Sequence, residues 1–261
     1  MPALTKNGVR FYAPRGKIMR GLAHDLADSL SICPEIQLNI HLGLHIDTIK
    51  RAEGINIGIQ TEQLQDDAGR QLWGVKGLRS IRKNLTNLDV LLEISKANRP
   101  VYEDLDLSEK SKIVVGPWIF SRESSRQNPG DGHLVFFGNK NERRSRIIEE
   151  VRKLHSVKVL PRGTFGADLE KEIAQASAIL NIHYCDGTYS EFPRILLALK
   201  YGKPLVSEVL ADPLEAYNHY VPINGAGDTG AASRAFSGMS KFAVEHSFDA
   251  LLQNVCREMK S

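Results

Sequence analysis

Short apolar runs of strand length alternate along this chain with segments in which apolar residues recur at helical spacing. The second half shows the alternation most clearly, and its predicted strands are 133–137, 157–160, 178–182 and 205–206. Between these runs, apolar residues recur every three or four positions at 147–154, 168–176 and 195–199. Strands that alternate with helices in this way predict a parallel sheet covered on both faces.

The first half follows the same pattern less regularly. Its predicted strands are 9–13, 36–40, 54–60, 88–94 and 112–120, and a helical period runs from 18 to 30. Residues 121–132 are polar and rich in glycine, proline and serine, which is typical of a linker. We therefore predict an α/β protein with two domains, residues 1–125 and residues 126–261, each near the usual domain size.

Composition and charge narrow the class of protein. With 25% charged and 42% hydrophobic residues among 261, the chain is typical of a soluble globular protein. A formal charge of +3 and a pI near 8.7 favour an anionic ligand or peripheral contact with an acidic membrane, but are too small to predict nucleic-acid binding. The three cysteines lack C-x-x-C spacing, and no apolar window has the length of a membrane span, so we expect a cytoplasmic protein.

The most informative stretch runs from Ser177 to Glu208. A strand is followed by a polar loop and then by a helix that ends at Gly202, where a left-handed cap is expected, before Pro204 leads into another strand. This stretch resembles the nucleotide-sugar half of the GT-B type glycosyltransferases, in which a loop Glu precedes a helix and a small-x-x-x-Gly-x-Pro-x-Val turn. The residues that carry the match are Glu191, Ala198, Gly202, Pro204 and Val206.

The resemblance implies a fold and a donor site. It implies two Rossmann-like domains that face each other across a cleft, with an activated sugar bound to the second. Glu191 would accept hydrogen bonds from the ribose, and the helix N-terminus beside it would face the diphosphate. Tyr184, Ser190 and Arg194 of the same loop and helix complete this part of the predicted donor site. From the residues alone, Glu191 is equally well interpreted as an acid that caps the helix.

A second signal opens the predicted second domain. Gly138 and Asn139 directly follow a strand, and Arg143 and Arg144 stand where the next helix begins. Glycine lets the backbone approach a diphosphate, and arginine donates forked, charge-assisted hydrogen bonds to it. The alternative is a solvated, charged helix face, since further charged residues follow.

The candidate for catalysis lies in the first half. Glu62 is in a polar loop at the carboxyl end of a predicted strand, where ligands bind in open α/β sheets, and it is our candidate for the general base. A helix-capping role is the alternative. Metal binding by His41, His45 and Asp47, or by Asp104 and Asp106, is the less favoured interpretation, so we assign no metal ligand and expect no cofactor.

These observations converge on a functional prediction. We expect a metal-independent glycosyltransferase that moves a sugar from a nucleotide-sugar donor to a hydroxyl of a glycan or another acceptor. The alternative is a nucleotide-sugar binding protein without catalysis, which the replacement of a second Glu of the family by Leu197 favours.

Overall fold

A computed structural model of the chain describes residues 4–14, 17–66, 68–72, 74–115, 125–128 and 130–259. It divides into two compact units, residues 1–122 together with 243–261, and residues 123–242. The sequence prediction assigned residues 243–261 to the second domain, whereas this division groups them with the first unit. Much of the predicted linker lies outside the described residues.

The first unit is built on a sheet with the order β1-β2-β3-β4-β5-β6 in its described part. Its strands are β1 (Leu4–Lys6), β2 (Val9–Tyr12), β3 (Leu38–Leu42), β4 (Ile55–Gln60), β5 (Val90–Glu93) and β6 (Ile113–Val115). Its helices are α1 (Lys17–Asp28), α2 (Gly74–Leu85), the 3-10 helix η1 (Lys96–Tyr102), α3 (Leu107–Lys110) and α8 (Phe248–Glu258). Strands β2 to β6 are parallel, and β1 pairs antiparallel with β2.

Helix α8 packs onto this sheet although it is distant in sequence. The ring of Phe248 is buried, with its centroid 6.3 Å from that of Phe11 in β2. Ser247 caps the helix, and the Asp249 carboxylate accepts a hydrogen bond of 3.0 Å from the amide of Ser31, just beyond α1. These contacts explain why the last residues belong to the first unit.

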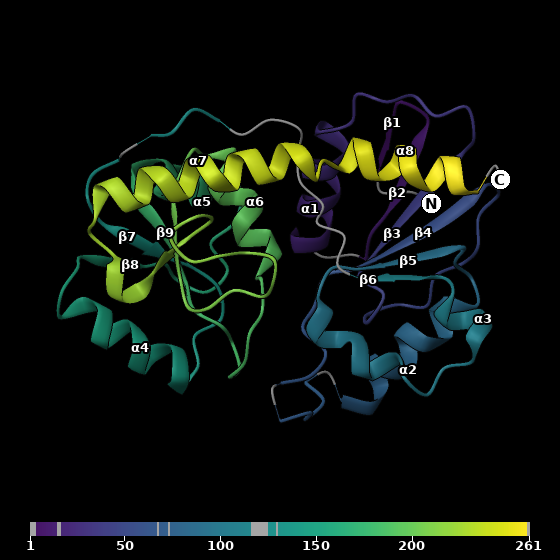
Figure 1. Cartoon of the computed structure of the whole chain (residues 1–261), viewed down its shortest axis with the longest axis horizontal. Coiled ribbons are helices and arrows are strands. Elements are labelled where there is room, and N and C mark those ends of the chain that lie inside the picture. Colours follow the sequence, from purple (N-terminus) through teal and green to yellow (C-terminus); the bar gives the residue numbers. More distant parts are fainter. Residues whose placement is uncertain are drawn as a thin grey trace. The chain divides into compact units, whose positions relative to one another are not determined.

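The second unit has a sheet of different order, β11-β10-β9-β7-β8, and its strands are parallel. The strands are β7 (Leu134–Phe136), β8 (Val157–Val159), β9 (Ala178–Asn181), β10 (Leu205–Ser207) and β11 (Val221–Pro222). The helices are α4 (Glu142–Arg152), α5 (Ala167–Gln175), α6 (Phe192–Lys200), η2 (Ile223–Gly225) and α7 (Thr229–Glu245). Figure 1 shows α4 on one side of this sheet and α5 and α6 on the other.

The core of the second unit confirms the predicted strands. Phe136, Leu180 and Val206 lie in one apolar cluster with Ile148 and Val151 of α4. Helix α6 ends at Lys200, and Gly202 just beyond it has the predicted left-handed conformation, with a φ of 64°. Gly202 lies so close to the Arg126 carbonyl that a Cβ would be 2.1 Å from its oxygen. Both sheets are largely parallel, so the predicted α/β class is confirmed.

Two expectations for the last part of the chain have different outcomes. The apolar residues of the segment 236–259 predict a largely helical segment, and this is confirmed by α7, which ends at Glu245, and by α8, which Ser247 caps. A short helix expected to begin at Asp212 and Pro213 is wrong, because these two residues form a turn.

Candidate functional site

Strand β7 is the point at which the strand order of the second unit reverses. The chain goes from β7 to β8 on one side, and β9 pairs with the other side of β7. The loops after β7 and β9 therefore leave the carboxyl edge of the sheet in opposite directions, so a crevice is expected between them, which is where ligands bind in such sheets. All the predicted donor residues lie in these two loops or in the first turns of α4 and α6.

Glu191 is at the centre of the charged residues in this region. It precedes α6 with a left-handed φ of 45°, and its side chain accepts none of the helix's own amide hydrogens. Its carboxylate instead lies between two guanidinium groups, with Oε1 2.9 Å from Arg144 Nη2 and Oε2 2.7 Å from Arg194 Nη1. The structure therefore does not support the capping alternative for this side chain.

Arg144 is buried in the first turn of α4. Nε donates to the carbonyl of Ile182 at 2.9 Å, and Nη1 donates to the carbonyl of Asn139 at 2.7 Å. Its guanidinium carbon lies 5.2 Å from the centroid of the Tyr184 ring. Burial, followed by the nearby charge of Arg194, lowers the pKa of Arg144 to about 10, and Glu191 opposes this shift. Arg144 therefore stays charged at neutral pH.

Arg194 approaches Glu191 from α6 and is buried as well. Nη1 donates to Asn181 Oδ1 and Nη2 donates to the carbonyl of Phe137, each at 2.9 Å. Among the described residues, Arg194 Nε and the hydroxyl of the fully buried Ser190 have no hydrogen-bond partner. Two polar groups beside the crevice are thus left unsatisfied by the protein, which is uncommon for buried groups.

Glycine at position 138 leaves room for the guanidinium group of Arg194. Gly138 has a φ of 109°, and a Cβ on it would lie 2.9 Å from Arg194 Nη2. Asn139 is exposed, and half of the Tyr184 surface is exposed (50%). Asn141, which the sequence analysis missed, caps α4 and also donates to the carbonyl of Tyr184 at 2.7 Å, so it ties the two loops together. Its signal in the sequence is an Asn directly before a helical period.

Arg143 is not part of this cluster. Its guanidinium forms a bidentate pair with Glu208 at 2.6 and 2.9 Å, donates to Asp186 at 2.5 Å, and donates to the carbonyl of His183 at 3.0 Å. Glu208 and Asp186 raise the pKa of Arg143 above its ordinary value. The structure thus brings Arg144, Glu191 and Arg194 together and places Arg143 in a second network.

In the first unit, Glu62 lies directly after β4, at the carboxyl edge of the sheet. Its carbonyl accepts hydrogen bonds from Asn98 Nδ2 at 2.8 Å and from Gln60 Nε2 at 3.3 Å. The side chain is half-buried. These bonds fix the backbone that carries the predicted base.

Three of the residues considered for metal binding, His41, Asp104 and Asp106, make other side-chain contacts in the structure. Asp106 caps α3 by accepting from the amide of Glu109 at 2.8 Å, and Asp104 forms a bidentate pair with Arg82. Burial lowers the pKa of His41, whose ring bonds Asn56. Burial also lowers the pKa of His45, in that case to about 4. Within the described ranges, no three His, Cys, Asp or Glu side chains gather as metal ligands would.

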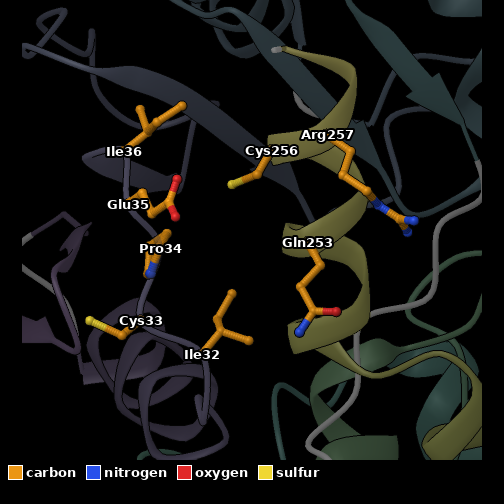
Figure 2. A pocket seen from close by; sticks show the side chains of 8 residues that line it. All are labelled: Ile32, Cys33, Pro34, Glu35, Ile36, Gln253, Cys256 and Arg257. Carbon is orange, nitrogen blue, oxygen red and sulfur yellow. The ribbon is translucent and has the colours of Figure 1, made fainter. Parts of the chain in front are cut away.

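Figure 2 shows a hollow of about 510 Å³ in the first unit. It lies between residues 32–36 and one face of α8, where Gln253, Cys256 and Arg257 line it. Because residues 32–36 lead into the amino end of β3, the hollow is at the opposite edge of the sheet from Glu62. It contains none of the predicted site residues.

No family model matches this sequence, and no curated protein is significantly similar to it. Among solved structures, a mutant of S. aureus TarM in complex with fondaparinux, α-GlcNAc-glycerol and UDP matches 85% of this chain and 55% of its own, with a TM-score of 0.50 and 12% identity. WaaB, a lipopolysaccharide outer core galactosyltransferase, matches 79% of this chain and 69% of its own, with a TM-score of 0.43 and 12% identity.

The chain has the GT-B type glycosyltransferase fold. The GT-B fold agrees with the two parallel sheets described above and confirms the resemblance inferred from the stretch 177–208. The chain spans only about half the length of the TarM chain. None of the helices in the described part of this GT-B chain combines the length and apolar character needed to cross a membrane.

Proposed function

We propose that this chain is a metal-independent glycosyltransferase that moves a sugar from a nucleotide-sugar donor to an acceptor hydroxyl in glycan or polysaccharide synthesis. The observation that carries the proposal is the cluster of Arg144, Glu191 and Arg194 at the switch point of the second sheet. The GT-B fold supports it, and so does UDP in the TarM complex that shares this fold.

The cluster has the chemistry that a departing diphosphate requires. Two guanidinium groups face one carboxylate, so one net positive charge stays in a largely buried site, where electrostatic effects are stronger than in water. The N-terminus of α6 adds its partial positive charge beside them. Negative charge on the leaving diphosphate would then be stabilised by these groups without a metal ion.

We assign the donor residues as follows. Glu191, held on both sides, would accept from the ribose hydroxyls, while Arg194 Nε and Ser190 Oγ would gain partners in the bound state. Exposed Asn139 and Tyr184, together with Gly138, would line the route to the crevice. Arg143 would contact the diphosphate only after releasing Glu208 and Asp186, so we expect it to contribute less than Arg144.

Glu62 is proposed as the general base. The acceptor hydroxyl would lose its proton to the Glu62 carboxylate as its oxygen bonds to the anomeric carbon of the donor. The bond from that carbon to the diphosphate oxygen breaks, and the nucleoside diphosphate leaves with the electron pair. This assignment applies to an inverting reaction.

Thermal unfolding in the presence of a panel of nucleotides and nucleotide sugars tests the donor site. A ligand at 100 times its Kd stabilises the folded state by about 2.7 kcal/mol, which raises the Tm by several degrees. We expect at least one nucleotide sugar to do so, and we expect Glu191→Gln to abolish the shift. Arg152→Ala is the control, because Arg152 is exposed and lies on the same helix α4 as Arg144. This variant should keep the Tm shift.

Release of free nucleoside diphosphate separates the two candidate functions. An enzyme turns over its donor, slowly with water and faster with an acceptor. A Tm shift without any release would favour the non-catalytic binder. If no nucleotide shifts the Tm, the donor site itself is refuted.

A further inference from the structure

A carboxyl group is completely buried at the end of β5. Glu93 is 0% exposed, and its neighbours Leu92 and Ile94 are buried as well. Within the described ranges, the groups that donate hydrogen bonds to it are neutral: the Ser95 amide at 3.0 Å, Asn98 Nδ2 at 2.9 Å and the Tyr102 hydroxyl at 2.6 Å. Burying an acid without a cationic partner is costly, and an apolar side chain would fill this space at lower cost.

Asn98 extends this network to the loop of Glu62. One hydrogen of its amide goes to Glu93, and the other goes to the carbonyl of Glu62 at 2.8 Å. Its oxygen accepts from the amide of Leu64 at 2.8 Å. The side chain therefore holds the backbone on both sides of Gln63.

Glu93 stabilises the same orientation of the Asn98 amide that the two loop contacts require. If the amide rotated by half a turn, its oxygen would face the Glu62 carbonyl and its NH₂ group would face the amide of Leu64, so neither contact could form. Glu93 Oε1 accepts from Nδ2 and stabilises the orientation that is observed. A fully connected buried network of this kind rigidifies the segment that it holds.

We propose that Glu93 is a positioning residue that acts through Asn98 to fix the loop 61–65, and with it the location of Glu62. The inference rests on the proposed function, because only that function makes Glu62 a general base that the loop must hold near an acceptor. It adds a residue that no motif in the sequence identifies and that itself touches neither donor nor acceptor.

Amide hydrogen exchange tests the structural step without any assay of activity. We expect Asn98→Ala and Glu93→Ala to accelerate exchange of the Leu64 amide, measured by NMR, at least 10-fold. Glu93→Gln keeps an oxygen for Asn98 and an NH₂ group that can donate to the Tyr102 oxygen, so it should keep the protection. Tyr102→Phe is the matched control, because it removes the hydrogen bond from Tyr102 to Glu93 and leaves the contacts of Glu93 with Asn98 and Ser95 in place.

Transfer kinetics test the functional step. A displacement of about 1 Å at a reacting group costs roughly 100-fold in rate. We expect Asn98→Ala to lower kcat by about that factor with the donor Kd unchanged, whereas Glu93→Gln and Tyr102→Phe should stay within a few-fold of the wild type. If Glu93→Ala does not fold, Asn98→Ala still provides both readouts.

Each result has one meaning. Unchanged Leu64 exchange in Asn98→Ala refutes the structural step. Faster exchange with unchanged kcat refutes the positioning of a catalytic group while the proposed function stands. A wild-type chain that binds donors but transfers no sugar refutes the proposed function, and the exchange rates still decide whether Glu93 holds the loop.

Discussion

The two sheets differ in the order of their strands, and this difference underlies the place that we propose for a charged ligand. In the first unit, β2 to β6 lie side by side in the order of the chain. In the second unit, the order reverses at β7. A reversal sends successive loops in opposite directions, and ligands of open α/β sheets usually bind at such a point. The strand order alone therefore favours the second unit as the place of the proposed donor site.

The polar groups buried at the two carboxyl edges differ accordingly. The second unit buries two guanidinium groups around one carboxylate, while the first buries a carboxyl group among neutral donors. In the second unit, the two guanidinium groups leave a net positive charge that suits the proposed anionic ligand. In the first unit, the neutral network around Glu93 holds a loop in place. The two proposed roles, a donor site and a support for a base, thus use different buried groups.

Breaking the charged cluster should have the largest effect. Glu191→Ala leaves two guanidinium groups in one buried site without their shared carboxylate, and removal of one partner from a buried pair costs about 3–5 kcal/mol. We expect a loss of that size in the free energy of unfolding, measured in urea. Glu149→Ala, which breaks an exposed pair on α4, should change it little. Equal losses of unfolding free energy in Glu191→Ala and Glu149→Ala would contradict the larger contribution that we assign to the buried cluster.

Removing the proposed base should affect turnover alone. Glu62→Gln keeps the size of the side chain and removes the proton acceptor, so transfer should fall by about 100-fold or more. The donor Kd should remain that of the wild type, because the donor is assigned to the second unit. Wild-type turnover would exclude Glu62, and wild-type turnover combined with a changed Kd would move it to the donor site.

Titration of Glu93 should make stability depend on pH. Burial raises the pKa of Glu93 to about 8, and bonds from Tyr102, Ser95 and Asn98 reduce the shift; Arg82 is the charged neighbour of Tyr102. The folded state therefore holds the proton more tightly than the unfolded state. The resulting stability is complete below the unfolded pKa of 4.5 and is lost as the pH rises to about 8.

Comparison with Glu93→Gln, which cannot titrate at this position, isolates the contribution of Glu93 to the pH dependence of stability. Between pH 5.5 and 7, the stability of the wild type relative to Glu93→Gln should fall by about 2 kcal/mol, because each pH unit is worth about 1.36 kcal/mol. Urea unfolding at several pH values measures it. Parallel stability curves would show that Glu93 is ionised in the folded protein over this range.

The smallest effect is expected at Gly138. Its φ of 109° is one that L residues rarely adopt, and a Cβ would lie 2.9 Å from Arg194 Nη2. Gly138→Ala should cost about 1 kcal/mol in stability and weaken donor binding by displacing that guanidinium. Gly132→Ala is the control, since it has a comparable φ of 84° but no neighbouring atom within 4 Å of the added Cβ. Equal donor Kd values in the two variants would show that Gly138 is only a turn residue.

The sequence predicted most of the strands because buried parallel strands are nearly continuous apolar runs, as at 178–182 and 205–206. It did not reveal α2: Leu78, Ile81 and Leu85 recur at helical spacing, but Gly74 and Gly77 in the first turns disfavour a helix there. Gly202 could be predicted because a helix cap is local in sequence.

The composition of the site could be predicted only in part, because side-chain partners depend on distant contacts. Arg143 and Arg144 are adjacent in sequence but about 100° apart around a helix, so they face different partners. One of them pairs with Glu208 and the other with Glu191, and nothing in the local pattern distinguishes the two. Glu93 resembles an ordinary polar residue at the end of a strand until Asn98 and Tyr102 are seen to enclose it.

The central claim is that a nucleoside diphosphate binds at the switch point of the second sheet. The most direct measurement is a crystal structure of the chain with the nucleoside diphosphate whose sugar derivative gives the largest Tm shift. We expect the diphosphate between the loops after β7 and β9, at the N-terminus of α6, with Glu191 on the ribose and Arg144 and Arg194 within hydrogen-bond distance. A nucleotide bound at any other position, with these three side chains still engaged only with one another, would contradict the account.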